Sequence, residues 1–189
     1  GQIEVALRHQ RPVEEYERVL SLVQGRALHL LHMVEMLLFL ARADADAKLP
    51  AHDRMDLATW LKQHLETWSE NPRWPDMRAE IAADAALYIE AHGPLLGQLL
   101  DNLLDNACKY SEPGTPIAIR LGDEAGAVAL RVEDAGPGIA AEDLPHIFEP
   151  FYRSPQARGQ NRAGVGLGLA IAQRIAAALG GVLQAESIA

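Results

Sequence analysis

Two asparagines, Asn102 and Asn106, lie four residues apart in a leucine-rich stretch that continues to Lys109 and Tyr110. If the stretch is a helix, these four polar side chains share one stripe along it. An amide oxygen is a good ligand for Mg²⁺, which takes few ligands from the protein and leaves room for phosphate oxygens. A neighbouring lysine would neutralise phosphate charge. The stretch alone is equally compatible with an ordinary amphipathic helix whose polar side chains lie in solvent.

This helix must also bury an apolar face. Gly93 and Pro94 are expected to open it, because proline is favoured at the first helical position. Asp101 and Asp105 fall on a third stripe and are expected to be solvated. The stripe predicted to face the core consists of Leu96, Leu100, Leu103 and Ala107.

A second candidate feature is the sequence VEDAGPGIA, which spans residues 132–140. In the strand expected before it, Asp134 has the parity of the valines, so its carboxylate should point to the apolar side. A buried carboxylate needs hydrogen-bond donors, and the exocyclic amine of a purine is a suitable one. Gly136 and Gly138 would let the backbone approach a flat ligand closely. Taken alone, the feature is more simply explained as a strand that ends in a common turn.

A third feature is a set of alternating glycines, Gly164, Gly166 and Gly168, at the start of an apolar helix. Free N–H groups at a helix N-terminus that follows glycine can bind phosphate. The chain has no G-x-x-x-x-G-K-[S/T] sequence, and no strand directly precedes these glycines. The P-loop and the dinucleotide-binding fingerprint are therefore excluded.

The stretch HIFEPFYRS, residues 146–154, and the basic segment after it form a fourth feature. Phe148, Pro150 and Phe151 are expected to be an apolar anchor. The rest lacks apolar periodicity, which suits either a solvated loop or a mobile lid whose arginines reach phosphates. These arginines are Arg153, Arg158 and Arg162.

The elements that must position these residues fall into two regions. Apolar residues recur at helical spacing between Val13 and Asp46, and a short turn before this helix joins it to the end of another. A helical hairpin of this kind buries little surface alone, so we expect a dimeric four-helix bundle. A linker is expected at residues 48–50. Beyond it, helices and strands alternate, which predicts an α+β domain with helices on one face of a mixed sheet. The predicted helices are 57–68, 93–111 and 166–179, and the predicted strands are 78–82, 86–91, 116–121, 127–134 and 182–186.

Composition excludes some classes of function. The formal net charge is −9, so nucleic acid is not an expected partner. Cys108 is the single cysteine, which rules out a disulfide within the chain and suits a reducing compartment. A packing role is expected for its thiol. The longest apolar run, residues 28–41, contains two histidines and a glutamate and is too short to span a bilayer. We therefore expect membrane contact only through segments outside this chain.

In combination, these motifs resemble the catalytic, ATP-binding domain of two-component sensor histidine kinases, a branch of the GHKL or Bergerat-fold group. NLLDNACKYS is similar to the N box of this family, DAGPGI to its first glycine box, FEPFYR to its F box and GVGLGL to its second glycine box. The opening GQIEVAL and the long helix resemble the dimerisation and histidine-phosphotransfer hairpin. The resemblance implies a partial hairpin at residues 1–48 and a catalytic domain with a Bergerat-type α/β sandwich at 49–189.

The resemblance also implies roles for individual residues. Asn106 matches the Mg²⁺-binding asparagine and, with Lys109, would be catalytic. Asn102 would face the nucleotide one turn earlier. Lys109 and Tyr110 would lie near the phosphates and ribose, and Asp134 would bind the adenine amino group. The other positions expected to contact ATP are Gly136, Gly138, Ile139, Phe151, Arg153, Gly164, Gly166, Leu167 and Gly168.

The implied activity is transfer of the ATP γ-phosphate to a histidine and then to an aspartate on a response regulator receiver domain, within a homodimer of a bacterial inner-membrane sensor. The H-E-x-x-T-P motif that carries this histidine does not occur in the chain. His9 lacks its acidic neighbour and is not assigned. We expect the motif to lie upstream of Gly1, and a further sheet strand to follow Ala189. Two alternatives remain: a GHKL-type ATPase, which would need a glutamate where Asn102 stands, and a nucleotide-binding dimeric scaffold without catalysis.

Overall fold

The computed structural model describes Pro12, residues 15–16, 19–20 and 23, and residues 52–82, 87–124, 126–159 and 165–187. The chain divides into two units, Gly1–Ala47 and Lys48–Ala189. The predicted hairpin at 1–48 and the linker at 48–50 lie almost entirely outside the described residues, as do His9, Arg162 and Gly164. Within the described ranges, no helix combines the length and the apolar character needed to cross a membrane.

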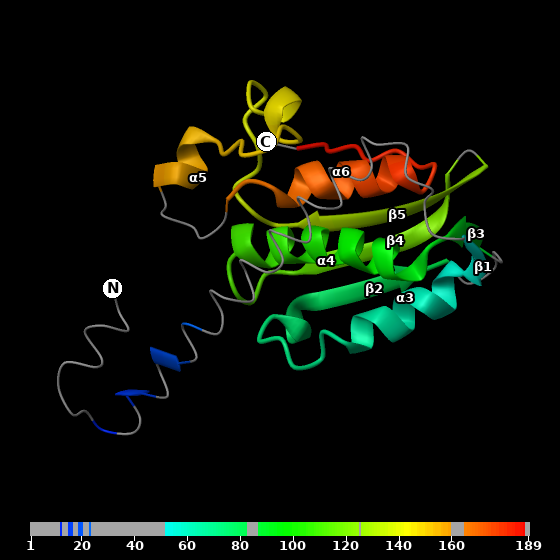
Figure 1. Cartoon of the computed structure of the whole chain (residues 1–189), viewed down its shortest axis with the longest axis horizontal. Coiled ribbons are helices and arrows are strands. Elements are labelled where there is room, and N and C mark those ends of the chain that lie inside the picture. The colour runs from blue at the N-terminus through cyan, green and yellow to red at the C-terminus, as the bar shows by residue number, and fades with distance from the viewer. Residues whose placement is uncertain are drawn as a thin grey trace. The chain divides into compact units, whose positions relative to one another are not determined.

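The second unit is built on a three-stranded mixed sheet (Figure 1). Its strands are β2 (Met77–Ile81), β4 (Ile117–Glu124) and β5 (Ala127–Asp134), in the order β2-β4-β5. β2 is parallel to β4, and β5 is antiparallel to β4, with Ile119 opposite Val132. The close sequence spacing of β4 and β5 fits this antiparallel pairing, whereas a parallel pair needs a longer connection.

A small antiparallel sheet lies beside the entry to the first helix. It pairs β1 (Asp53–Asp56) with β3 (Tyr88–Ala91). The next helix, α3 (Leu57–Glu66), begins where the Asp56 carboxylate accepts a hydrogen bond from the Ala58 N–H at 3.1 Å. Asp56 is therefore the N-cap of α3. β1 was not predicted, because four residues with two aspartates carry little strand signal.

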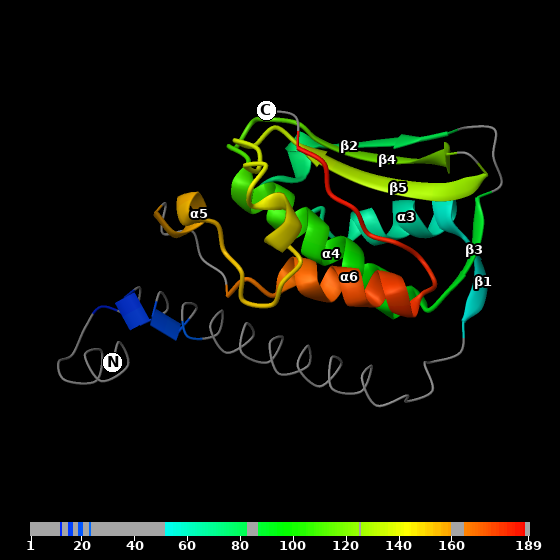
Figure 2. The same ribbon diagram turned by 90° about the horizontal axis from the view of Figure 1, so that it is seen from above.

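Three helices, α3, α4 (Gly93–Tyr110) and α6 (Gly168–Ala178), lie on one face of the mixed sheet (Figure 2). This confirms the predicted fold class for the second unit. The short helix α5 (Pro155–Gly159) and two 3₁₀ turns, Trp74–Asp76 and Leu144–His146, belong to the connections.

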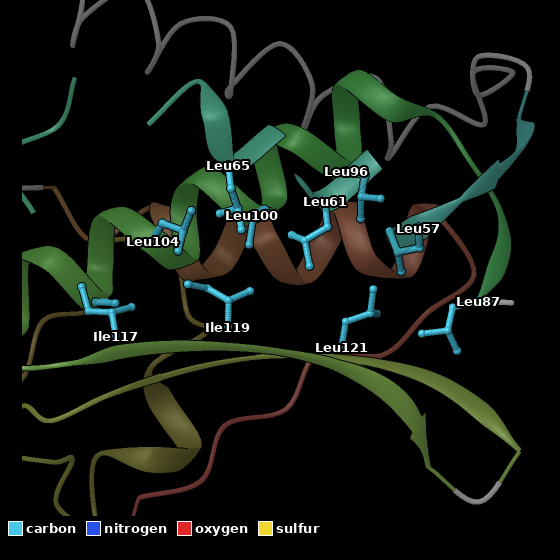
Figure 3. Close-up of a cluster of buried hydrophobic side chains, with 11 residues drawn as sticks. Leu57, Leu61, Leu65, Leu87, Leu96, Leu100, Leu104, Ile117, Ile119 and Leu121 are labelled. Atoms are coloured by element: carbon cyan, nitrogen blue, oxygen red, sulfur yellow. The ribbon is translucent and has the colours of Figure 1, made fainter. Parts of the chain in front are cut away.

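The core lies between β4 and these helices. Figure 3 shows the side chains of Ile117, Ile119 and Leu121 directed from β4 towards leucines of α3 and α4. The three residues alternate along the strand, so one face of β4 is apolar from Ile117 to Leu121. On α4 the buried stripe contains Leu104, whereas Leu103 is only half-buried. The prediction that Leu103 faces the core was wrong, because the helix buries the side nearer to Leu100 and Leu104.

The predicted strand at 182–186 is also wrong. Residues 181–187 form neither a strand nor a helix, and Val182 is 83% exposed. A turn at Gly180, with a φ of +77°, ends α6 and redirects the chain. The following valine and leucine carry strand propensity, but a strand also needs a ladder of hydrogen bonds to a neighbour.

Replacing Leu100 by alanine tests this core. Leu100 is fully buried between α4 and the sheet, so the truncation should lower the free energy of unfolding by about 2–5 kcal/mol. Val182→Ala removes exposed apolar atoms and should change it by less than about 0.5 kcal/mol. Urea unfolding followed by circular dichroism measures both. Equal effects of the two substitutions would contradict the assignment of the core.

Candidate functional site

The second half of α4 carries the polar stripe predicted from the sequence. Asn102 is only 7% exposed, and its Nδ2 group donates to the Gln98 carbonyl at 2.9 Å. Asn106, Lys109 and Tyr110 are each half-buried. Because the Asn102 Nδ2 group bonds within its own helix, the side-chain oxygen points away from α4 and is directed at the neighbouring helix.

That neighbour is the N-terminus of α6. A Cβ atom added at Gly168 would lie 3.3 Å from Asn102 Oδ1 and 3.7 Å from Asn106 Nδ2. In the part of the chain that the structure describes, no side chain caps α6, and the cap position is the buried, apolar Leu167. The first N–H groups of α6 therefore lie beside two amide side chains. This arrangement brings together the predicted residues Asn102, Asn106, Leu167 and Gly168.

The loop after β5 approaches the C-terminal end of α4. Asp134 pairs with the buried Ile117 across the ladder, so its side chain lies on the helix-facing side of the sheet, as its parity predicts. The carboxylate is nevertheless exposed and accepts the Gly136 N–H at 2.8 Å. The carboxylate was expected to be buried, but Asp134 is the last residue of β5 and its side chain is exposed. A Cβ at Gly136 would lie 2.8 Å from the Tyr110 carbonyl oxygen, so this close approach requires glycine.

The rest of this loop continues towards the end of the described chain. Gly138 adopts a positive φ of 74°. The Ile139 N–H donates to Ser187 Oγ at 2.8 Å, which ties the loop to residues 181–187. The loop is therefore fixed at both ends, at Gly136 against α4 and at Ile139 against Ser187.

The F-box and glycine-rich segments meet through their backbones. The Phe151 N–H donates to the Gly166 carbonyl at 2.8 Å, and Phe151 has a φ of +67°. A Cβ at Gly166 would lie 2.4 Å from the Tyr152 carbonyl oxygen, which only glycine avoids. Phe151 is 60% exposed and Pro150 is also exposed, so the predicted apolar anchor is wrong for both. Phe148 alone of the three is half-buried.

Polar contacts anchor this segment in place of Pro150 and Phe151. The Tyr152 hydroxyl donates to Asp143 Oδ1, and Asp143 is buried. The Arg153 guanidinium donates to the Ala157 carbonyl at 3.0 Å, so in this conformation it stabilises α5. Aromatic composition alone indicated an apolar contact, whereas the tyrosine uses its hydroxyl group.

The end of α4 carries three further groups of interest. Lys109 Nζ lies 4.8 Å from the centre of the Tyr110 ring, a cation–π contact. Cys108 is half-buried against the core, and burial raises the pKa of its thiol. A raised pKa lowers the thiolate fraction at neutral pH, which agrees with the expected packing role.

Sequence reasoning missed one contact that fixes α4. Asp101 was expected to be solvated, but its Oδ1 atom accepts from Trp68 Nε1 and pairs with His64 Nε2, both at 2.8 Å. A Cβ at Gly97 would lie 2.9 Å from the His64 ring, so glycine makes room for this contact. The four-residue spacing of His64, on α3, and Trp68, in the turn after it, was the available signal. Asp105 is exposed, as predicted.

These groups can hold a phosphorylated ligand. The uncapped start of α6 suits an anion, and the Asn106 amide could supply an oxygen ligand to Mg²⁺. Among the residues that the structure describes, no three His, Cys, Asp or Glu side chains cluster as a metal site would require. Mg²⁺ usually takes few ligands from the protein and the others from phosphate and water.

The chain is similar to known proteins over most of its length. Residues 91–189 match the family described as "Histidine kinase-, DNA gyrase B-, and HSP90-like ATPase". The chain is 35% identical to the sensor histidine kinase YkoH of Bacillus subtilis over 86% of its length, and 33% identical to the sensor protein IrlS of Burkholderia pseudomallei over 99%. It spans 35% and 40% of the length of these two relatives.

Solved structures are also similar to this chain. Full-length ShkA in complex with AMPPNP is 29% identical to this chain, with a TM-score of 0.70 over 91% of this chain and 35% of that one. The Acinetobacter baumannii histidine kinase AdeS is 25% identical, with a TM-score of 0.68 over 95% of this chain and 80% of that one. The expected resemblance to the ATP-binding domain of sensor kinases is thereby confirmed, and the chain belongs to the histidine kinase-, DNA gyrase B- and HSP90-like ATPase family.

Proposed function

We propose that this chain contains the catalytic core of a sensor histidine kinase, which transfers the γ-phosphate of ATP to a histidine and then to a response regulator. One observation carries the proposal: the start of α6 lies against both Asn102 and Asn106 at Gly168. A helix N-terminus that binds anions and an amide suited to Mg²⁺ are thus adjacent. Relatives and solved structures that are named sensor kinases support the choice.

The proposed roles follow from the contacts. The N–H groups of α6 bind phosphate oxygens, and the Asn106 amide oxygen is a Mg²⁺ ligand. Mg²⁺ supplies charge neutralisation at the phosphates when it is bound. Lys109 adds a further positive charge. Asp134, exposed at the open end of the sheet, accepts from the adenine amino group, and Gly136 allows the base to approach the backbone.

The remaining expected contacts belong to the same proposal. Gly138, Ile139 and Tyr110 line the base and ribose side, and Phe151, Arg153, Gly164 and Gly166 belong to a lid over the phosphates. The Arg153 guanidinium, which donates to the Ala157 carbonyl, would contact a phosphate from this lid. Gly166, held to Phe151, would be the hinge.

The whole protein's organisation is also proposed. Residues 1–48 would form part of a dimerisation hairpin and 49–189 the catalytic domain. Two chains would complete a four-helix bundle, and a receiver domain would accept the phosphoryl group. The proposed location is cytoplasmic, in a protein anchored to the inner membrane by other segments, and relatives that are named sensor proteins support it.

A GHKL-type ATPase is the less favoured alternative. Such an enzyme needs a carboxylate near the nucleotide to activate water, and Asn102 stands one turn before Asn106. An amide cannot act as a general base. The Asn102 Nδ2 group is moreover bonded to Gln98. In a kinase the attacking group is a histidine nitrogen, so the nucleotide site needs no water-activating carboxylate.

Asn106→Ala tests the proposed Mg²⁺ ligand. Titration calorimetry with a non-hydrolysable ATP analogue and Mg²⁺ should give a dissociation constant raised by about tenfold or more, because a charge-assisted contact is lost. In EDTA the variant and the parent chain should bind alike. Asp105→Ala, an exposed neighbour on α4, should bind as the parent does. An effect of Asn106→Ala that persists in EDTA would contradict the metal role.

Gly168→Ala tests the contact between α6 and the two asparagines. Alanine is the better helix former, so stability should be unchanged or raised by up to about 1 kcal/mol. The added methyl group would press on the Asn102 side chain, so the dissociation constant for the ATP analogue should rise about fivefold. Gly122→Ala in β4, where a Cβ would make only an ordinary contact with the Ala82 Cβ at 4.0 Å, is the control. Unchanged affinity in Gly168→Ala would contradict the proposed phosphate site.

Labelling distinguishes the three activities. A chain that carries a histidine motif on its N-terminal side is incubated with Mg²⁺ and γ-labelled ATP, and both protein-bound label and free phosphate are followed. Acid-labile, base-stable label on the protein, abolished by Asn106→Ala, is the expected result. Steady phosphate release without such label would establish an ATPase. Nucleotide binding with neither signal would establish a scaffold.

A further inference from the structure

A buried arginine outside the motifs holds the end of α4. Arg73 is 8% exposed, and one nitrogen of its guanidinium, Nη1, donates to the carbonyls of Cys108 at 2.7 Å and Ser111 at 2.9 Å. These two carbonyls lie immediately before Lys109 and immediately after Tyr110. The arginine thus fixes the backbone on both sides of two residues that are proposed to face the nucleotide.

The second nitrogen extends this contact into the following loop. Nη2 donates to Ser111 Oγ at 2.9 Å and to the Thr115 carbonyl at 3.4 Å. The Ser111 hydroxyl in turn donates to the Ala107 carbonyl at 2.6 Å. The last turn of a helix leaves carbonyl oxygens without partners within the helix, and a cation there is favourable. Arg73 supplies both the donors and the charge.

Arg73 is itself held from two sides. Its Nε group donates to Asp76 Oδ2 at 2.6 Å, and the same oxygen accepts the Gly114 N–H at 3.0 Å. Its backbone N–H donates to Asn71 Oδ1 at 2.8 Å. The hydrogen bond from Arg73 lowers the pKa of Asp76, which favours the ionised carboxylate. The guanidinium is therefore pre-positioned before any ligand binds.

The last turn of α4 also sets the distance between this helix and the loop after β5. The Tyr110 carbonyl oxygen lies so close to Gly136 that a Cβ there would be 2.8 Å away. Gly136 also donates to Asp134. A shift of the α4 end would therefore change the gap to the loop that carries Asp134, as well as the positions of Lys109 and Tyr110.

From this geometry we infer that Arg73 is a positioning residue for nucleotide binding, which acts through the last turn of α4. It contacts no part of the nucleotide itself. The inference rests on the proposed function, since it assumes that Lys109, Tyr110 and Asp134 face ATP. If Arg73 only stabilised the fold, its substitution would change the fraction of folded protein and leave the affinity of the folded fraction unchanged.

Calorimetric titration of the full chain with Mg²⁺ and a non-hydrolysable ATP analogue separates these two roles. The stoichiometry reports the folded fraction, and the dissociation constant reports the site. Arg73→Met should raise the dissociation constant about tenfold, and Arg73→Lys should fall between Met and the parent, because one ammonium cannot reach both carbonyls and Asp76. Arg120→Met is the matched control: this arginine bonds Glu80 and Glu133 but is exposed on the sheet.

Ser111→Ala is a second, milder variant that keeps the guanidinium and removes one of its acceptors. It should raise the dissociation constant two- to fivefold, and it keeps the test decisive if Arg73→Met does not fold. An unchanged dissociation constant in both Arg73→Lys and Ser111→Ala, with the parent still binding, would overturn the inference and leave the proposed function intact. Failure of the parent chain to bind the analogue would overturn the proposed function itself.

Discussion

The placement of α4 is the constraint on which the rest of the second unit depends. One side of this helix packs Leu100 and Leu104 against the apolar face of β4. The neighbouring side presents Asn102 and Asn106 to α6. Because 100° separates successive residues on a helix, a rotation of α4 would move the amides away from α6 and the leucines away from β4 together. The core therefore decides where the polar stripe points, and the site inherits its geometry from packing.

Packing alone sets the rotation of α4 loosely, and polar contacts make it definite. Near the middle of the helix, Asp101 is held by His64 of α3 and by Trp68 in the turn after α3. At the C-terminal end, Arg73 holds the carbonyls of Cys108 and Ser111. A buried hydrogen bond has a narrow range of allowed distances and angles, whereas apolar contacts tolerate sliding. These contacts fix the helix in both rotation and axial position.

Sequence reasoning predicted the features that follow from local rules. The 3.6-residue period predicted α4 and its polar stripe, and the parity of Asp134 predicted the side of the sheet it occupies. It failed where tertiary partners decide. Asp101 has the same local pattern as the exposed Asp105, and only the position of α3 separates them. Leu103 and Leu104 are adjacent leucines, and the direction of the neighbouring sheet determines which one is buried. Residues 182–186 have strand propensity without a hydrogen-bonded ladder.

Arg73 was missed for a related reason, since 35 residues separate it from Cys108 and no period or motif connects the two. The electrostatics of α4 nevertheless call for such a group. The C-terminus of a helix carries partial negative charge, and α4 ends beside the residues proposed to face a polyanionic ligand. An uncompensated helix end would repel that ligand. The guanidinium satisfies these carbonyls and offsets their charge, while α6 directs its positive N-terminus to the same region. Two helix ends of opposite polarity thus become compatible with one anionic ligand, and the compensating charge comes from a residue outside every motif.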